Sequence, residues 1–278
     1  MDTALNGKRA LVTGAGDGIG REIAEALARE GAAVAVHGRG MERISATLEA
    51  IRAQGGTALP ALADLLDEDA IDAMCHKACA DLGGLDILVC NAGICTLQDT
   101  SEMTAETWKA ILATNLTAPF LIARAVHPAL VHSGADASVI FISSIAAEAH
   151  TAGWGAYAAS KSGLNAFMHC LADELGAHGV RVNTIAPGWV DTKMAQGLHR
   201  GMAAAADAPY AALYAGGMRG NMLGALLTPD SIADMAVFLA SERGRFITAQ
   251  TLKICGGCVP GSRGGESSAE RAAALANS

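Results

Sequence analysis

The chain has 278 residues, a net charge of −8 at pH 7 and an apolar fraction of 51%. This length suits one α/β domain with a full core, and the negative charge argues against nucleic acid or an anionic membrane as a partner. No uninterrupted apolar run is long enough to cross a bilayer, and residues 1–9 lack the pattern of a signal peptide. We therefore expect a soluble cytoplasmic protein.

Short apolar runs alternate with longer amphipathic runs along the chain. The short runs predict strands at Arg9–Thr13, Ala33–His37, Thr57–Ala61, Asp86–Cys90, Ser138–Ser143, Arg181–Ala186 and Gln250–Ile254. The longer runs predict helices at Ile19–Glu30, Met41–Gln54, Asp67–Leu82, Glu106–His132, Gly155–His178 and Asp230–Glu242. The strand runs are apolar throughout, as expected when helices cover both faces of a sheet. The pattern predicts a Rossmann-type, doubly wound parallel α/β sheet of about seven strands.

Two stretches depart from this alternation. Residues 193–228 are rich in Ala, Gly and Met and contain no clear strand, so they form either a substrate lid or a helical excursion. Residues 261–278 are rich in Gly, Ser and Ala and predict a flexible C-terminal tail. No compositional break divides residues 1–260, which we interpret as a single dinucleotide-binding and catalytic domain.

The seven cysteines are scattered and odd in number, which predicts free thiols in a chain without a secretory signal. Only Cys255 and Cys258 have a suggestive spacing. A structural zinc site needs two further ligands at a matching spacing, and the sequence offers none. We therefore predict no metal site and interpret the pair as ordinary thiols.

A glycine-rich segment follows the first predicted strand and opens the first helix. Gly14 permits a tight turn, Gly18 lets the backbone approach a pyrophosphate, and Gly20 lets helix and strand pack closely. Asp17 and Ile19 complete the loop, and the helix N-terminus offers N–H donors to phosphates. Any tight β-α turn favours glycine, but the strand before it and the helix after it favour a dinucleotide cradle.

Two more short motifs follow predicted strands. Asp64, followed by Leu65, can accept a hydrogen bond from an adenine amino group or can cap a helix. The segment Asn91, Ala92 and Gly93 either brings backbone close to a cofactor ribose or forms a plain turn. Ligands bind at the carboxyl ends of strands in open α/β sheets, and all three motifs lie there.

A reacting centre is suggested by Tyr157 and Lys161, whose spacing of four places them on one helix face. An ammonium near a phenol favours the phenolate and lowers the tyrosine pKa; a surface Tyr/Lys pair is the alternative interpretation. Ser144 ends the fifth strand, where its hydroxyl can hold a substrate oxygen. Asn115 lies within the long helical run of residues 106–132, where a buried amide needs a partner, such as a water relayed from Lys161.

Together these residues resemble the short-chain dehydrogenase/reductase family in its compact single-domain form, over roughly residues 5–258. The matching motifs are Thr13-Gly14-x3-Gly18-Ile19-Gly20, Asn91-Ala92-Gly93, Asn115, Ser144, Tyr157-x3-Lys161 and Pro187-Gly188-x3-Thr192. The resemblance implies hydride transfer between a nicotinamide cofactor and the carbon of a secondary alcohol or ketone.

The resemblance also implies a catalytic tetrad. Ser144 would steady the substrate oxygen and Tyr157 would donate or remove its proton. Lys161 would bind the nicotinamide ribose and lower the pKa of Tyr157, and Asn115 would anchor a water. The nicotinamide would be bracketed by a set of four residues, Pro187, Gly188, Val190 and Thr192.

The cofactor prediction rests on the residues after the second strand. NAD-preferring relatives commonly carry an acidic residue where this chain has Gly38, and its absence before Arg39 favours NADP over NAD. Arg39 can instead stack on the adenine or point to solvent. Asp17 would repel a ribose phosphate, unless it caps the helix and turns away.

The substrate is less defined by the sequence. Glu148, His150 and Trp154 lie between Ser144 and Tyr157 on a segment expected to border the pocket, although they suit ordinary packing equally well. We expect a small-molecule alcohol or carbonyl as substrate.

The resemblance makes a homo-oligomer plausible, either a tetramer or a dimer. The chain departs from the family pattern at positions that serve subunit contacts and the closing strand in relatives. Ala225 replaces an arginine, Ala249 a glycine and Cys255 an aspartate.

Two other classes of function are compatible with a sheet of this kind. A non-catalytic dinucleotide-binding regulator or scaffold uses the same fold, but such proteins usually lose a member of the tetrad. Sugar-nucleotide epimerases and dehydratases have a different glycine spacing and a larger substrate domain, for which this chain has no room.

Overall fold

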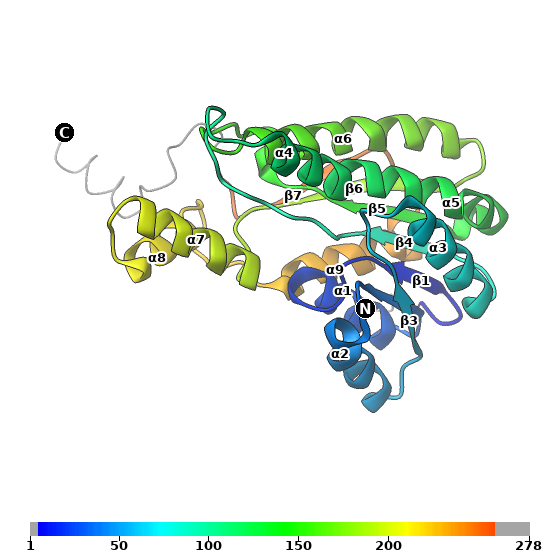
Figure 1. The fold of residues 1–278 in the computed structure, drawn as a ribbon. Coiled ribbons are helices and arrows are strands. Elements are labelled where there is room, and N and C mark those ends of the chain that lie inside the picture. Colours follow the sequence, from blue (N-terminus) through cyan, green and yellow to red (C-terminus); the bar gives the residue numbers. More distant parts are fainter. Residues whose placement is uncertain (1–4, 259–278) are drawn as a thin grey trace.

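The computed structural model describes residues 5–258, which form a seven-stranded parallel sheet in the order β3-β2-β1-β4-β5-β6-β7 (Figure 1). The strands are β1 (Arg9–Val12), β2 (Ala33–Gly38), β3 (Ala58–Leu62), β4 (Ile87–Cys90), β5 (Ser138–Ile142), β6 (Arg181–Pro187) and β7 (Thr251–Ile254). The predicted doubly wound sheet is confirmed, and each strand begins and ends within one residue of its predicted bounds.

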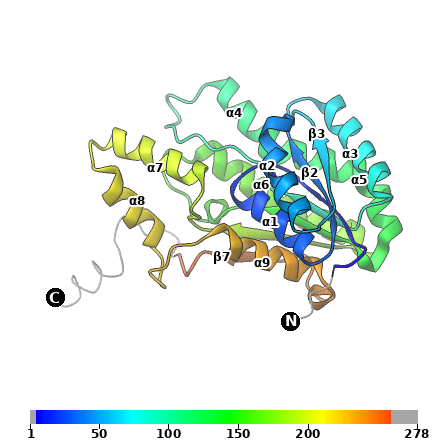
Figure 2. The ribbon, with the colours of Figure 1, turned by 90° about the horizontal axis from the view of Figure 1, so that it is seen from below.

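Helices cover both faces of the sheet (Figures 1 and 2). One face carries α1 (Gly18–Arg29), α2 (Met41–Ala53) and α9 (Pro229–Ala240), and the other carries α3 (Glu68–Leu82), α4 (Ala105–Leu112), α5 (Ala118–Ser133) and α6 (Gly155–Gly176). Each face has its own apolar core, built from the side chains that alternate along the strands. The inner strands β4, β5 and β6 are buried along their whole length, whereas the edge strands β3 and β7 are partly exposed.

The helical run predicted over residues 106–132 is interrupted. Between α4 and α5 the backbone widens into a π-helical turn, η1 (Ala113–Thr117), where the N–H of Ala118 bonds to the carbonyl of Ala113. Asn115 lies within this turn and is fully buried. Side-chain periodicity cannot reveal one extra residue in a turn, so the sequence predicts a continuous helix here.

By length and composition, the helical stretch Ala105–Asp136 could cross a membrane, with a mean hydropathy of 1.2. Its most apolar window is 44% buried within the protein, and its α5 portion packs against α3 in the layer that covers the sheet. The apolar side chains of this stretch therefore contribute to the core of the protein.

Residues 193–228 form a pair of helices, α7 (Lys193–Ala205) and α8 (Tyr210–Arg219), that packs together beyond the sheet (Figure 1). Thr192 caps α7 by accepting from the N–H of Ala195 at 3.2 Å. The segment contains two helices, as either form predicted for it allows, and its role as a lid stays a prediction. The predicted tail, residues 261–278, lies outside the described residues.

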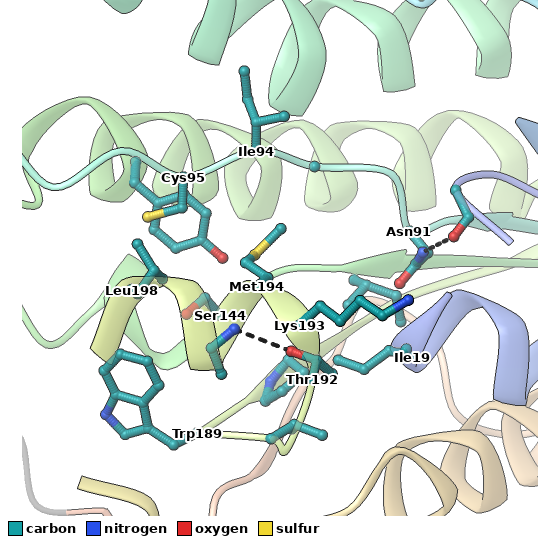
Figure 3. A pocket seen from close by; sticks show the side chains of 18 of the residues that line it. Ile19, Asn91, Ile94, Cys95, Ser144, Trp189, Thr192, Lys193, Met194 and Leu198 are labelled. Atoms are coloured by element: carbon teal, nitrogen blue, oxygen red, sulfur yellow. Dashed lines mark hydrogen bonds between the residues drawn. The ribbon is translucent and has the colours of Figure 1, made fainter. Parts of the chain in front are cut away.

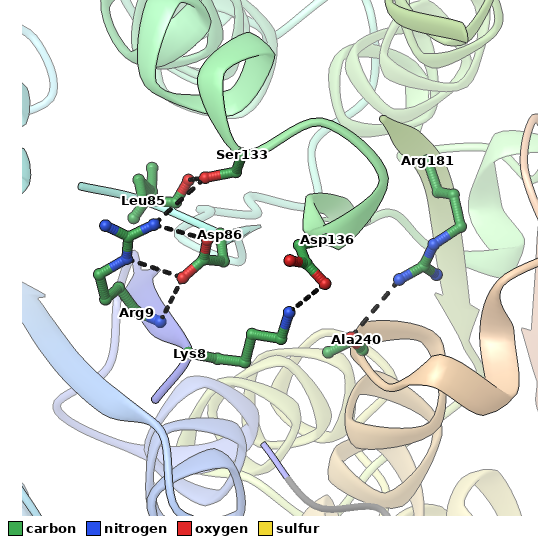
Figure 4. A network of polar contacts seen from close by, with 8 residues as sticks. All are labelled: Lys8, Arg9, Leu85, Asp86, Ser133, Asp136, Arg181 and Ala240. Carbon is green, nitrogen blue, oxygen red and sulfur yellow. Dashed lines mark hydrogen bonds and ion pairs between the residues drawn. The ribbon is translucent and has the colours of Figure 1, made fainter. Parts of the chain in front are cut away.

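The amino end of the sheet is held by buried polar contacts (Figure 4). The guanidinium of Arg9 donates to both carboxylate oxygens of Asp86, at 2.7 and 2.8 Å. Burial alone would raise the pKa of Asp86, but the hydrogen bonds from Arg9 and Ser133 outweigh it and leave the pKa lowered. Arg181 donates to the carbonyl of Ala240, at 3.4 Å, near the C-terminal end of α9. These contacts stabilise the end of the sheet opposite to the site described next.

Candidate active site

A cavity of about 1320 Å³ lies at the carboxyl ends of the strands. Ile19, Asn91 and Thr192 line one end of it, and Cys95, Trp189 and Leu198 line the other (Figure 3). All the residues predicted from the sequence to bind cofactor line this cavity: Gly14, Asp17, Gly18, Ile19, Gly20, Arg39, Asp64, Leu65, Asn91, Ala92, Gly93, Tyr157, Lys161, Pro187, Gly188, Val190 and Thr192. Ser144, Glu148 and Trp154 line it too, whereas Asn115 and His150 do not.

The glycine loop is shaped for close approach of backbone. Gly14 and Gly18 have φ of +62° and +53°, in the left-handed region that glycine adopts without strain. A Cβ on Gly14 would lie 2.9 Å from the Cα of Ala92, and one on Gly18 would lie 3.1 Å from the methyl group of Thr192. A Cβ on Gly20 would collide with the carbonyl of Gly14. The loop therefore leaves room for a ligand at the N-terminus of α1 and fits a dinucleotide pyrophosphate.

Asp17 caps α1, and its carboxylate accepts from the N–H of Gly18 at 2.8 Å. The same carboxylate forms an ion pair with Lys193, the first residue of α7, at 2.7 Å. The sequence left open whether Asp17 would repel a phosphate or turn away as a cap. The structure places it as a cap with a cation beside it, and Lys193 was not predicted because it lies 176 positions further along the chain.

His37 lies buried under the glycine loop and was also not predicted. Its Nδ1 accepts from the N–H of Gly14 at 3.1 Å, and its Nε2 lies 3.3 Å from the carbonyl of Ala63. The accepting Nδ1 implies a neutral ring with its proton on Nε2. Burial lowers the pKa of His37 to about 4, which keeps the ring in this form. His37 thus fixes the glycine loop to the ends of β2 and β3.

At the end of β2, Gly38 has no room for a side chain. A Cβ there would lie 2.6 Å from the Cγ2 of Ile44. Arg39 is exposed and lines the cavity together with Arg43 and Glu42, which lie on the first turn of α2. The guanidinium of Arg43 is 3.9 Å from the carboxylate of Glu42. This edge of the cavity carries two arginines and one carboxylate, of which the sequence singled out only Arg39.

The motifs after β3 and β4 differ in how their side chains are used. Asp64 accepts from the N–H of Leu66 at 3.0 Å, while Asp67 caps α3. The alternative interpretation of Asp64 as a helix cap is therefore wrong. The amide of Asn91 donates to the carbonyl of Thr13 at 2.9 Å and to that of Gly14 at 3.1 Å, which ties this loop to the glycine loop.

Tyr157 and Lys161 lie one turn apart at the start of α6, beside Ser144 at the end of β5. The ammonium of Lys161 is 5.7 Å from the centroid of the Tyr157 ring and donates to the carbonyl of Ile142 at 2.8 Å. Lys161 is only 3% exposed, and burial lowers its pKa to about 8. A buried ammonium with one carbonyl partner retains two N–H donors for a ligand.

Burial raises the pKa of Tyr157 above its ordinary value, and a hydrogen bond with Ser144 acts in the opposite direction. The sequence led us to expect that Lys161 lowers this pKa. In the structure, burial is the largest cause of the shift in the pKa of Tyr157. The phenol is therefore the resting form of Tyr157.

Asn115 does not line the cavity, and both N–H groups of its amide are bonded within the protein, while its Oδ1 keeps one lone pair. Its Nδ2 donates to the carbonyl of Ile94 at 2.9 Å and to the hydroxyl of Ser160 at 3.0 Å, and its Oδ1 accepts from the N–H of Ile94 at 2.9 Å. No side-chain N–H remains for the predicted water. The amide instead fixes the loop that carries Gly93, whose Cβ would lie 3.5 Å from the Nζ of Lys161.

The segment after β6 closes the same end of the cavity as the glycine loop. The N–H of Gly188 donates to the carbonyl of Ile254 at 2.9 Å, and Val190 forms an isolated bridge with Leu227. Pro187 ends β6 and Thr192 opens α7. The four residues predicted to bracket the nicotinamide therefore all line this end of the cavity.

The three predicted substrate residues behave differently. Trp154 packs edge-on against Tyr157, with ring centroids 5.8 Å apart. Glu148 is exposed at the rim and pairs with Lys253. His150 is exposed and is not part of the cavity lining, so the structure does not bring it to the site.

An aromatic row extends from Tyr157 to the helices α7 and α8, and two of its members, Trp189 and His199, were not predicted. Trp154 contacts Trp189 at 5.7 Å between centroids, and the rings of Trp189 and His199 pack at a tilt, with centroids 4.2 Å apart. His199 contacts Tyr214 at 5.3 Å. The position of Trp189 inside the Pro187–Thr192 motif was the one signal in the sequence that could have identified it. Within residues 5–258 no group of three or more His, Cys, Asp or Glu side chains could hold a metal ion.

Comparison with known proteins agrees with the fold and the cavity. Residues 8–203 match the family model for the short chain dehydrogenase. The chain is 34% identical to a 3-oxoacyl-(acyl-carrier-protein) reductase of Chlamydia pneumoniae, over 92% of this chain and 99% of that protein. A short chain dehydrogenase from Burkholderia cenocepacia in complex with NADP superposes with a TM-score of 0.80 at 34% identity, covering 91% of this chain and 98% of that one.

A second solved structure is a 7α-hydroxysteroid dehydrogenase complexed with NADH and 7-oxo glycochenodeoxycholic acid. It superposes with a TM-score of 0.83 at 29% identity, over 93% of this chain and 97% of that one. Both the family model and the curated relative cover most of the chain. The protein therefore belongs to the short-chain dehydrogenase family of nicotinamide-dependent oxidoreductases.

Proposed function

We propose that the protein transfers a hydride between a nicotinamide cofactor and the carbon of a secondary alcohol or ketone, with Tyr157 as the acid and base. The observation that carries this proposal is the convergence of Ser144, Tyr157 and Lys161 on the cavity that also contains the glycine loop. A regulator that only binds dinucleotides would not require these three side chains to meet there.

In the direction of ketone reduction, the resting phenol of Tyr157 would serve as the acid. Burial raises the pKa of Tyr157, so its hydroxyl stays protonated at neutral pH and can donate to the carbonyl oxygen. Ser144, which lines the same cavity, would donate a second hydrogen bond to that oxygen. The buried ammonium of Lys161 then stabilises the phenolate that proton donation leaves behind. When bound, the cofactor supplies the hydride.

We propose NADP as the cofactor. Gly14, Gly18, Ile19 and the N-terminus of α1 would hold the pyrophosphate, and Pro187–Thr192 would hold the nicotinamide. Gly38 has no room for the acidic side chain that accepts from the ribose hydroxyls in NAD-preferring relatives. Arg39 and Arg43 line the same edge, where a phosphate on the ribose would find a positive charge.

The remaining cofactor contacts follow from the loops at the same end of the sheet. Asp64 and Leu65 would border the adenine, and Asn91, Ala92 and Gly93 would border the ribose. Solved relatives contain NADP or NADH, so the choice between them rests on the residues at the end of β2.

For the substrate we propose a largely apolar ketone that enters beneath α7. Trp154, Trp189 and Leu198 line this end of the cavity (Figure 3). The names of two relatives describe ketones, a 3-oxoacyl group and a 7-oxo steroid. We also propose that residues 1–260 form a single domain in which residues 193–228 are the substrate lid. The protein would act as a homo-oligomer in the cytoplasm, and its only partners would be small molecules.

The function is tested by following the absorbance of the reduced cofactor with a panel of ketones and secondary alcohols, using NADPH and NADH. We expect turnover of at least one apolar ketone, with a higher kcat/KM for NADPH. Arg39→Ala should lower that preference by roughly tenfold, since it removes a charged contact to phosphate. Cofactor binding without turnover of any substrate would favour a regulator, and an unchanged preference would refute the role of Arg39.

The ion pair between Asp17 and Lys193 leads to a second prediction. Lys193→Ala should weaken NADPH binding up to about fivefold, because it leaves the Asp17 carboxylate unpaired beside the phosphates; exposed pairs contribute at most about 1 kcal/mol. The dissociation constant of NADPH, measured by titration, checks this.

The control is the double variant Asp17→Asn with Lys193→Ala, in which the repulsive charge is also removed. Near-normal affinity of the double variant is expected. If the double variant loses as much affinity for NADPH as Lys193→Ala alone, Lys193 contacts the cofactor directly and does not act through Asp17.

A further inference from the structure

The two cysteines of the Cys255-Gly-Gly-Cys258 segment meet in a tight turn immediately after β7. The N–H of Cys258 lies 3.3 Å from the Sγ of Cys255, and the Sγ of Cys258 lies 3.2 Å from the carbonyl oxygen of Cys255. Both cysteines carry free thiols. Each sulfur thus contacts the backbone of the other residue, so both side chains belong to one tight turn.

The turn is fixed by the two glycines between the cysteines. Gly256 and Gly257 have φ of +63° and +80°, a conformation that other residues rarely adopt. A Cβ on Gly256 would lie 2.5 Å from the side-chain oxygen of Asn221, and one on Gly257 would lie 2.9 Å from the Cβ of Met222. The chain therefore turns back at this point, against the residues that follow α8, and cannot hold the cysteines apart.

The two thiols differ in access. Cys255 is buried, whereas Cys258 is half-buried and lines the cavity. Burial beside Cys255 raises the pKa of Cys258 to about 11, so the thiol is the resting form. If Cys258 reacts selectively with a disulfide, the reason is therefore the second thiol close by, and not a low pKa of Cys258 itself.

We propose that Cys255 and Cys258 form a dithiol–disulfide site that is oxidised by small-molecule disulfides of the glutathione class. The thiolate of Cys258 attacks one sulfur of the oxidant, forms a mixed disulfide and releases one reduced thiol. The thiolate of Cys255 then attacks the Sγ of Cys258, forms the internal S–S bond and releases the second reduced thiol. The two protons lost by the cysteines end on the two released thiols, and the oxidant takes up the two electrons.

The turn contacts both the cofactor end of the cavity and the segment after α8. A Cβ on Gly188 would lie 3.0 Å from the Cβ of Cys255, and the carbonyl of Gly256 accepts from the N–H of Leu223 at 3.1 Å. Closing an S–S bond requires a defined Cβ separation and dihedral angle, so it shifts these contacts. We infer that oxidation lowers catalytic efficiency; this consequence rests on the proposed function, whereas disulfide formation does not.

The chemistry is tested by treating the full-length, folded protein with oxidised glutathione, alkylating the free thiols and digesting with trypsin. Cleavage after Lys253 and Arg263 gives the peptide 254–263, which contains Cys255 and Cys258 and no other cysteine. We expect this peptide to lose two hydrogen atoms and escape alkylation. Cys258→Ser should leave Cys255 alkylated, and Cys255→Ser should trap Cys258 as a mixed disulfide with glutathione.

Two results would overturn the site. One is a peptide 254–263 that stays fully alkylated while the exposed Cys170 becomes glutathionylated. The other is a disulfide that joins either cysteine to a different peptide. Mass spectrometry detects both results without any measurement of activity. A failure of the proposed function can therefore be distinguished from a failure of the proposed disulfide site.

The consequence for catalysis is tested by kcat/KM before and after oxidation. We expect a decrease of roughly fivefold in the wild type, reversal by dithiothreitol, and no decrease in Cys258→Ser. Cys95 also lines the cavity, so Cys95→Ser is oxidised in parallel and compared with its own untreated activity. If the internal disulfide forms and kcat/KM is unchanged, the inferred effect on catalysis is wrong.

Discussion

Replacing Tyr157 by phenylalanine is expected to lower kcat by about 10³-fold while leaving the affinity for the cofactor almost unchanged. The substitution removes one hydroxyl and keeps the ring, which packs against Trp154 at 5.8 Å. Lys161 keeps its hydrogen bond to Ile142, and the glycine loop is untouched. The proton donor is lost, but the residues proposed to hold the cofactor stay in place.

The measurement compares kcat from steady-state kinetics with the dissociation constant of NADPH from a fluorescence titration. Tyr210→Phe is the matched control, because Tyr210 belongs to α8 and does not line the cavity. The control should keep turnover close to that of the wild type. Turnover of Tyr157→Phe within tenfold of the wild type would mean that another group delivers the proton, and the proposed mechanism would fail.

Much of the fold could be predicted because its signals are local. A parallel strand that is buried on both faces must be apolar throughout. The sequence of β5 therefore predicts a buried strand, because Ser138 is followed by Val139, Ile140, Phe141 and Ile142. The glycine that the family carries at the position of Ala249 also has a local cause, which leaves the alanine of this chain strained. Its φ of +55° lies in the left-handed region, where glycine is unstrained and alanine is not.

What could not be predicted depends on contacts between distant segments. Lys193 neutralises Asp17 across the cavity, and His37 supports Gly14 from the neighbouring strand; neither pairing has a spacing that a motif could encode. The π-helical turn at Asn115 changes the backbone without changing the apolar pattern. The same turn directs the amide toward Ile94, so the amide holds a loop that the sequence did not reveal, and the water on Asn115 stays a prediction.

The row of rings from Trp154 through Trp189 to His199 was missed for a similar reason. Its members come from three separate segments and meet only because α7 folds back over the cavity. His150 shows the converse error. It lies within the segment between Ser144 and Tyr157, yet that segment turns outward and leaves the imidazole exposed.

Acidification is expected to destabilise the folded protein through His37. Burial lowers its pKa to about 4 in the folded state, whereas an unfolded histidine titrates near 6.5. Between these two values the unfolded chain binds a proton that the folded protein does not, so the free energy of unfolding falls as the pH falls. The loss begins near pH 6.5, reaches about 2 kcal/mol at pH 5 and approaches about 3 kcal/mol near pH 4.

The test compares the wild type with His37→Asn in denaturant titrations from pH 7 to pH 5. The asparagine oxygen can accept from the N–H of Gly14 in place of Nδ1, but the side chain does not titrate. The stability advantage of the wild type should therefore shrink by about 2 kcal/mol over this range. His169→Asn, which removes an exposed imidazole, controls for general effects of the substitution.

If the free energies of unfolding of the wild type and of His37→Asn fall in parallel as the pH is lowered, His37 is not the source of the acid sensitivity. Protonation of His37 in the folded protein would have a consequence for the site, because a doubly protonated ring has no lone pair for Gly14. It would release the N–H that the glycine loop directs at His37, at 3.1 Å, and loosen the cradle proposed for the pyrophosphate. Because the pKa of His37 in the folded protein is about 4, NADPH affinity should change little through His37 from pH 7 to pH 5 and fall as the pH approaches 4, less steeply in His37→Asn.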